Sequence, residues 1–202
     1  MAASSRYKAL GRSLERLRKH HLGFARRLAG GYTERQLSQA AAYTVFAHGE
    51  FEHFLEAWAS EILDAIAVKG FGPGFSPMLA HLLAYRSSLT VPSQIPPNNA
   101  WHTSAGAAIS GQRAAVRNNN GISERYVCAL LMPLGVDVIG IDPILISDLN
   151  AFAKIRGDHA HQSLRVHLGQ QFDPFDRLAK VNNIYSLLQP FDEDLQKHLK
   201  LC

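Results

Sequence analysis

The side chains best suited to acid–base and phosphate chemistry lie together late in this sequence. They form the segment Arg156-Gly157-Asp158-His159-Ala160-His161. An apolar stripe precedes this segment, so we expect its polar groups to be buried or nearly buried and to need partners. Histidine has the side-chain pKa nearest neutrality, and arginine presents a fork of donors that matches a phosphate. The segment is therefore our candidate site.

Helical spacing decides which of these side chains can act together. Arg156 and His159 are three residues apart, which makes them neighbours on one helix face. Arg156 and His161 are about 140° apart around the helix. They face one cleft only if the helix distorts or if both line a groove. Gly157 makes distortion cheap, because glycine costs about 1 kcal/mol of helix propensity relative to alanine.

Two other interpretations of the segment remain open. Arg156 could form an ion pair with Asp158 or Glu52, with the histidines as packing residues. A metal site from His159, His161 and His167 is the less favoured one, because no cysteine or acid stands at ligand spacing. The sequence contains no phosphate loop, nucleophile elbow or dinucleotide fingerprint, so we expect no cofactor.

The elements that must position this segment are helices. Apolar residues recur at three- and four-residue steps most clearly over Glu34–Lys69, which predicts a long central helix. Capping and breaking residues predict the others. They run from Ser4 or Ser5 to about Leu28, over Pro77–Tyr85, over Ser104–Val116, from Ser123 to Leu134, from Asp142-Pro143 through the candidate segment, and from Asp173-Pro174 to about Leu199 with an interruption near Pro190. Residues 136–141 are the best strand candidate but have no pairing partner, so the predicted fold is all-α.

Length and composition indicate one globular domain. The chain has 202 residues, of which 47% are hydrophobic and 19% charged. We expect a single domain over 1–202, with a basic helix in 1–30 and an insertion in 70–120. No signal peptide is visible, and the apolar runs are far shorter than the roughly 20 residues of a membrane span. No disulfide framework is indicated, so we expect a cytoplasmic protein without a membrane partner.

The positive charge of the chain is concentrated at its N-terminal end. Residues 1–27 hold eight basic residues and one acid, Glu15, whereas the whole chain carries a net charge of +4. Such a helix attracts polyanions such as RNA. A solvated helix face is the alternative.

The spacing Arg156-(Gly-Asp-His-Ala)-His161 resembles the Arg-X4–6-His motif of the HEPN superfamily. The stretch 41–55 also resembles the helix in which these proteins carry an aromatic–acid pair. The order of Asn120-Gly121-Ile122-Ser123, a helix, Leu134-Gly135 and the motif helix is similar to RiboL-PSP-like HEPN branches. The resemblance covers about residues 34–68 and 118–200.

This resemblance implies a bundle of four or five helices that forms a homodimer, with the motifs of both copies in one cleft. Many HEPN proteins are metal-independent ribonucleases acting in antiviral defence or as toxins, some of them with a neutralising antitoxin or regulatory partner. His161 would then be the general acid or base, with His159 as the alternative. Arg156 would bind the scissile phosphate, and Asp158 or Glu52 would orient Arg156 or His161.

The residue after the motif arginine departs from the family pattern. Active HEPN nucleases commonly have Asn, Asp or His there, and this chain has Gly157. The alternative expectation is therefore an inactive HEPN-like module that binds RNA, a nucleotide or a protein partner in the same cleft.

Overall fold

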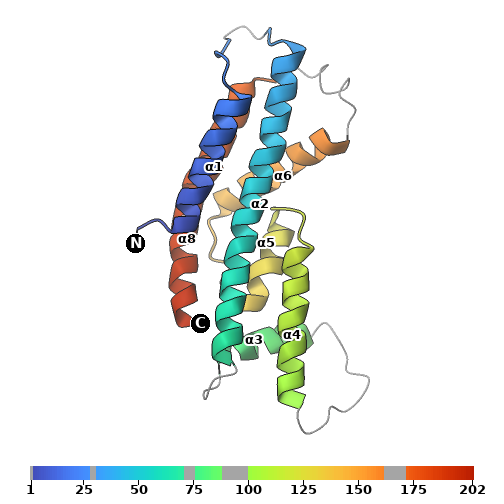
Figure 1. Cartoon of the computed structure of the whole chain (residues 1–202), viewed down its shortest axis with the longest axis vertical. Coiled ribbons are helices and arrows are strands. Elements are labelled where there is room, and N and C mark those ends of the chain that lie inside the picture. The colour runs from blue at the N-terminus through green and yellow to red at the C-terminus, as the bar shows by residue number, and fades with distance from the viewer. Residues whose placement is uncertain (1, 28–30, 71–75, 88–99, 162–171) are drawn as a thin grey trace. The chain divides into compact units, whose positions relative to one another are not determined.

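The computed structural model describes residues 2–27, 31–70, 76–87, 100–161 and 172–202, with side chains except at 70, 87, 100–102 and 158–161. Over this part of the chain the structure is helical and contains no strand. The elements are α1 (Ser5–His21), α2 (Glu34–Gly70), α3 (Pro77–Ser87), α4 (Ala100–Arg117), α5 (Glu124–Leu131), the 3-10 helix η1 (Met132–Leu134), α6 (Pro143–His161) and α8 (Pro174–Leu201) (Figure 1). The all-α prediction is confirmed for the described residues.

The chain divides into two compact units. The first contains residues 1–54, 121–124 and 142–193, and the second contains residues 55–120, 125–141 and 194–202. Helices α2 and α8 each contribute residues to both units. The candidate segment and the basic helix α1 belong to the first unit.

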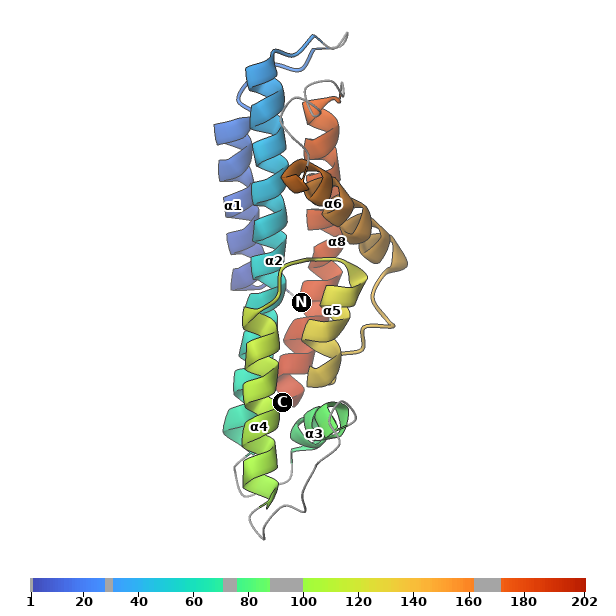
Figure 2. The same cartoon turned by 90° about the vertical axis from the view of Figure 1, so that its right-hand side faces the viewer.

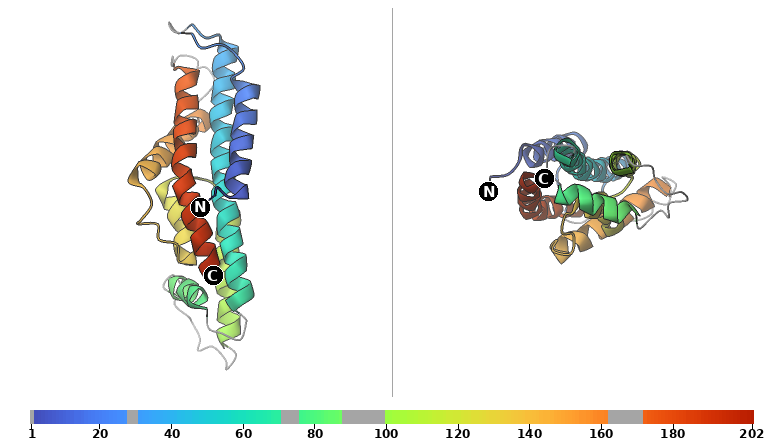
Figure 3. Two further views of the ribbon diagram at one scale, coloured as in Figure 1. Left: turned by 90° about the vertical axis from the view of Figure 1, so that its left-hand side faces the viewer. Right: turned by 90° about the horizontal axis from the view of Figure 1, so that it is seen from below.

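In the first unit, α1 and α8 run antiparallel. Ser4, which precedes α1, donates its amide hydrogen to Asp192 over 2.9 Å. Beyond the other end of α1, Arg26 pairs with Asp173 at 2.9 Å. Between these ends the rings of Tyr7 and Tyr185 stack with their centroids 4.3 Å apart. The first half of α2 lies beside α1 and α8 (Figure 3).

Helix α6 crosses the same unit obliquely against α2 and α8 (Figure 2). Asp142 caps its start by accepting a hydrogen bond from the amide of Ile144 over 2.8 Å. Phe152 of α6 is fully buried and meets the ring of Phe51 of α2 edge to face, with centroids 5.9 Å apart. On the α8 side, the half-buried Lys180 forms an ion pair with Asp148. These contacts fix the helix that carries the candidate segment.

In the second unit, the end of α2 packs beside α4. Arg113 of α4 pairs with Asp64 at 2.7 Å. The buried Gln112 donates to the carbonyl oxygens of Ala129 and Leu130 over 3.2 and 3.0 Å, which ties α4 to α5. These two helices therefore share a core within the unit.

Several helix boundaries differ from prediction. Ser4 caps α1 as predicted, by accepting from the amide of Tyr7 over 3.0 Å, but α1 ends at His21 and not near Leu28. The chain leaves the helix at Leu22, which is buried. Burial of Leu22 and the Arg26–Asp173 pair outweigh continuation of the helix.

The predicted interruption of the last helix is wrong. Helix α8 continues through Pro190 to Leu201. Proline inside a helix costs about 3 kcal/mol. The neighbouring Leu188, Phe191 and Asp192 are buried, and their packing offsets that cost. The strand candidate at 136–141 is a turn region.

Candidate functional site

The candidate site is built around a buried histidine of α2. His48 is 2% exposed and lies one helical turn before Glu52 on the same helix face. Its Nδ1 is 3.9 Å from a carboxylate oxygen of Glu52. The Glu52 side chain is 18% exposed, but its Oε1 atom is buried.

The positive charge of Arg156, which lies on α6, acts on His48. Burial, and secondarily the positive charge of Arg156, lower the pKa of His48 to about 4. The imidazole is therefore neutral at pH 7, with about one molecule in a thousand protonated there. The ring of Phe152 stacks near the His48 ring at a centroid distance of 6.4 Å and excludes water from that side.

This arrangement determines what each group can do. A general acid or base works best with a pKa near the working pH, and the pKa of His48 lies far below it. His48 therefore suits positioning, since a neutral imidazole can both donate and accept a hydrogen bond. The guanidinium of Arg156 presents a fork of donors that can hold an anion such as a phosphate.

The structure describes only some of the predicted site residues. Glu52 lies 3.9 Å from His48, and the charge of Arg156 lowers the pKa of His48. Asp158, His159 and His161 belong to the last turn of α6, but their side chains are outside the described residues. His167 also lies outside them. The three-histidine metal site and the choice between His159 and His161 therefore stay as sequence-based predictions.

Gly157 does not break the helix. Helix α6 is α-helical from Pro143 to His161, so positions 156 and 161 stay about 140° apart around its axis. A Cβ added to Gly157 would meet no atom within 4 Å. Glycine is thus not required there by packing. The distortion that would turn both positions toward one side is not seen in the backbone.

Comparison with known proteins returned no match. No protein-family model, no curated protein and no solved structure matches this chain.

Two further findings concern the described part of the chain. It contains no group of three or more His, Cys, Asp or Glu side chains placed to hold a metal ion. None of its helices combines the length and the apolar character that a membrane span requires.

His48 is the site residue that the sequence analysis missed. Its spacing to Glu52 and its place in the apolar stripe of the long helix were the available signals. The contact of His48 with Phe152 and the influence of the Arg156 charge had no local signal, because both depend on how α6 crosses α2.

Proposed function

We propose that this protein is a metal-independent endoribonuclease of HEPN type. One observation carries the proposal: the positive charge of Arg156, the motif arginine, acts on His48, whose Nδ1 is 3.9 Å from Glu52. That pair belongs to the stretch 41–55 that resembles the aromatic–acid helix of the family. The neutral imidazole of His48 and the carboxylate of Glu52 are groups that can orient a phosphate-binding arginine.

In the proposed reaction, the 2′-oxygen of a ribose attacks the adjacent phosphorus. The bond from phosphorus to the 5′-oxygen of the next nucleotide breaks, leaving a 2′,3′-cyclic phosphate. His161 takes the proton of the 2′-hydroxyl or gives one to the leaving 5′-oxygen, with His159 as the alternative. Arg156 stabilises charge on the phosphate, and Glu52 or Asp158 orients Arg156 or His161. The reaction requires RNA because DNA lacks the 2′-hydroxyl.

The regular helix through Gly157 supports a dimeric form of this site. Within one chain, positions 156 and 161 face different directions. Two copies related by a two-fold axis can supply the arginine of one chain and the histidine of the other to one cleft. The proposed protein is thus a homodimer.

The proposed setting is the cytoplasm, in antiviral defence or as a toxin. An unregulated ribonuclease would damage its own cell, so a neutralising antitoxin or regulatory protein is part of the proposal.

The deciding experiment is incubation of the purified chain with labelled single-stranded RNA in excess EDTA. We expect cleavage with cyclic-phosphate ends, and a loss of at least about 100-fold in rate for Arg156→Ala and for His161→Ala. Lys154→Ala is the matched control, because Lys154 is an exposed cation on the same helix. Unchanged cleavage by the Arg156 and His161 variants would show that this site assignment is wrong.

A second candidate function is favoured by Gly157 itself, which stands where active HEPN nucleases commonly have Asn, Asp or His. If the helix does not distort and the chain does not pair, Arg156 remains an anion-binding group without a catalytic histidine opposite it. The protein would then be an inactive HEPN-like module that binds RNA, a nucleotide or a protein partner. RNA binding in EDTA without any turnover selects this alternative.

A further inference from the structure

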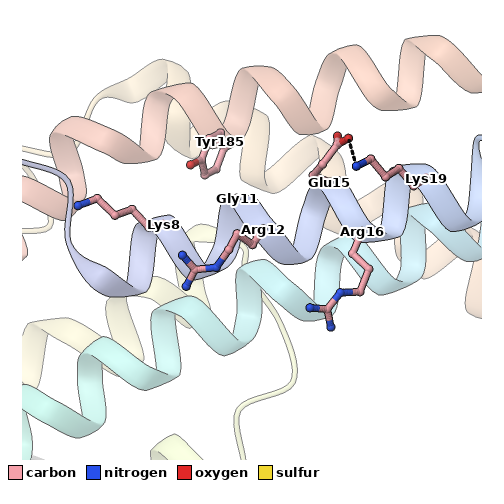
Figure 4. A pocket seen from close by; sticks show the side chains of 7 residues that line it. All are labelled: Lys8, Gly11, Arg12, Glu15, Arg16, Lys19 and Tyr185. Carbon is pink, nitrogen blue, oxygen red and sulfur yellow. Dashed lines mark ion pairs between the residues drawn. The ribbon is translucent and has the colours of Figure 1, made fainter.

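Helix α1 carries a straight stripe of cations on one exposed face. The stripe consists of Lys8, Arg12, Arg16 and Lys19, which follow one another at steps of four, four and three residues. These steps keep side chains on the same side of a helix. At 1.5 Å per residue the stripe is about 17 Å long. Figure 4 shows the four side chains along α1.

The stripe lines a groove between α1 and α8 in the first unit. The groove has a volume of about 740 Å³ and is lined by the four cations together with Gly11, Glu15 and Tyr185. The Tyr185 ring lies directly over Gly11, where an added Cβ would be 2.4 Å from the phenol oxygen. Tyr7 supports the ring from one side. The groove thus combines an aromatic side chain with a row of cations.

The charge of this groove is not balanced within the described structure. Glu15, the one acid among its lining residues, accepts a hydrogen bond from Arg18 over 2.7 Å and lies 3.6 Å from Lys19. The hydrogen bond from Arg18 lowers the pKa of Glu15 to about 2, so its charge is already engaged. Among the described residues, no carboxylate lies within ion-pair distance of Lys8, Arg12 or Arg16.

Stability of the fold does not explain the stripe. Like charges four residues apart destabilise a helix by roughly 0.2–0.5 kcal/mol per pair. The face of α1 that stabilises the fold is the opposite one, where Tyr7, Leu10 and Leu14 are buried. Because that apolar face is occupied, α1 has no free apolar surface to insert into a bilayer. A dissolved polyanion is the partner that these features fit.

We propose that this groove binds the phosphate backbone of a single-stranded nucleic acid. A row of four cations matches a ligand whose negative charges repeat along a line. A basic groove with an aromatic side chain is the usual combination for single strands, because phosphates meet the cations while a base contacts the ring. RNA and DNA share the phosphate chemistry, so the groove accepts both. This binding goes beyond the proposed cleavage and does not depend on Arg156.

The test uses fluorescence anisotropy of a labelled 12-nucleotide deoxythymidine strand and its 2′-O-methyl uridine counterpart. Neither strand can be cut by attack of a 2′-hydroxyl. With four phosphates engaged, the logarithm of the association constant falls with the logarithm of salt concentration with a slope of about −2.8. Both strands are expected to give this slope. A preference for the 2′-O-methyl strand of more than tenfold would overturn recognition through the phosphates alone.

The decisive variant is Arg12→Gln/Arg16→Gln. Losing two phosphate contacts reduces the slope to about −1.4 and the affinity at 0.1 M salt by about 25-fold. The matched control is Arg35→Gln/Arg125→Gln, which removes the same charge from exposed positions outside this groove and leaves the slope unchanged. Glu15→Gln removes the one lining acid and is expected to tighten binding. Circular dichroism spectra equal to wild type confirm that each variant is folded.

Three further results would overturn the proposal. The first is an equal loss of affinity in the double variant and its control, which would show that binding depends only on the net charge of the protein. The second is a wild-type slope near zero. The third is binding of phosphatidylserine vesicles without binding of either strand. Because neither strand can be cut by attack of a 2′-hydroxyl, binding to the groove is measured without turnover, so failure of the cleavage proposal and failure of this one are distinguishable.

Discussion

At the residue scale, His48 couples the candidate site to the stability of the fold. Its pKa is lowered by burial and by Arg156 to about 4, whereas an unfolded histidine titrates near 6.5. Below pH 6.5 the unfolded chain therefore binds a proton that the folded chain does not. This contribution to stability is complete above pH 6.5 and is lost as the pH falls towards 4.

We expect the free energy of unfolding to fall by about 3 kcal/mol between pH 7 and pH 4 on account of His48. Urea unfolding at a series of pH values measures this dependence. His48→Gln should flatten the profile in that window, because glutamine does not titrate. His53→Gln is the control, since His53 is exposed on the same helix. An unaltered profile in His48→Gln would contradict the burial argument.

Asp192 is the residue that holds the start of α1. It is fully buried and accepts from the amide nitrogen of Ser4 over 2.9 Å and from its Oγ over 2.6 Å. We expect Asp192→Ala to lower the free energy of unfolding by about 2 kcal/mol, because charge-assisted hydrogen bonds are lost and buried donors remain. Denaturant unfolding is the measurement.

The control for this change is Asp194→Ala. Asp194 pairs with Lys197 at 2.6 Å, but both side chains are more than half exposed. Exposed ion pairs contribute little, so a change below about 0.5 kcal/mol is expected. Equal effects of the two substitutions would show that the Ser4 anchor has no special role.

At the element scale, Gly135 and Gly157 have opposite roles in the backbone. Gly135 ends η1 with φ of 78°, and an added Cβ would lie 2.8 Å from the sulfur of Met78. Gly157 lies inside α6 with open space around it. The first glycine is required by the backbone, whereas the second is tolerated at a cost in helix propensity.

We therefore expect Gly135→Ala to destabilise the protein by about 1–2 kcal/mol and Gly157→Ala to stabilise it by up to about 1 kcal/mol. Thermal unfolding followed by circular dichroism compares the two. If catalysis needs the helix to bend at Gly157, the stabilised Gly157→Ala variant will lose cleavage in EDTA. If Gly157→Ala retains cleavage, Arg156 and His161 are brought together by the pairing of two chains and not by a bend in the helix.

At the scale of the whole molecule, the proposed dimer predicts complementation between two inactive variants. Arg156→Ala and His161→Ala chains are mixed after unfolding and refolding together. Half of the dimers are then mixed, and each mixed dimer contains one intact Arg–His combination. About a quarter of wild-type RNA cleavage is therefore expected. Absence of recovery in dimers of confirmed mixed composition would contradict a site shared between chains.

Much of the secondary structure could be predicted because its signals are local. The long helix was predicted over Glu34–Lys69 and found over Glu34–Gly70, since its apolar periodicity needs no information about partners. The Ser4 cap was predictable for the same reason. The end of α1 and the continuation of α8 through Pro190 were not, because burial of Leu22 and Leu188 depends on distant parts of the chain.

The sequence by itself determined the helical class, the chemistry of Arg156 and the charge of the first helix. Only the tertiary structure brought the charge of Arg156 to act on His48, aligned Tyr185 of α8 with Gly11 of α1, and left the cations of α1 facing outward. Residue type and spacing specify what a side chain can do and which helix face it occupies. Desolvation and neighbouring charge specify what it does at pH 7, and both arise from packing between helices that the sequence separates by about a hundred residues or more.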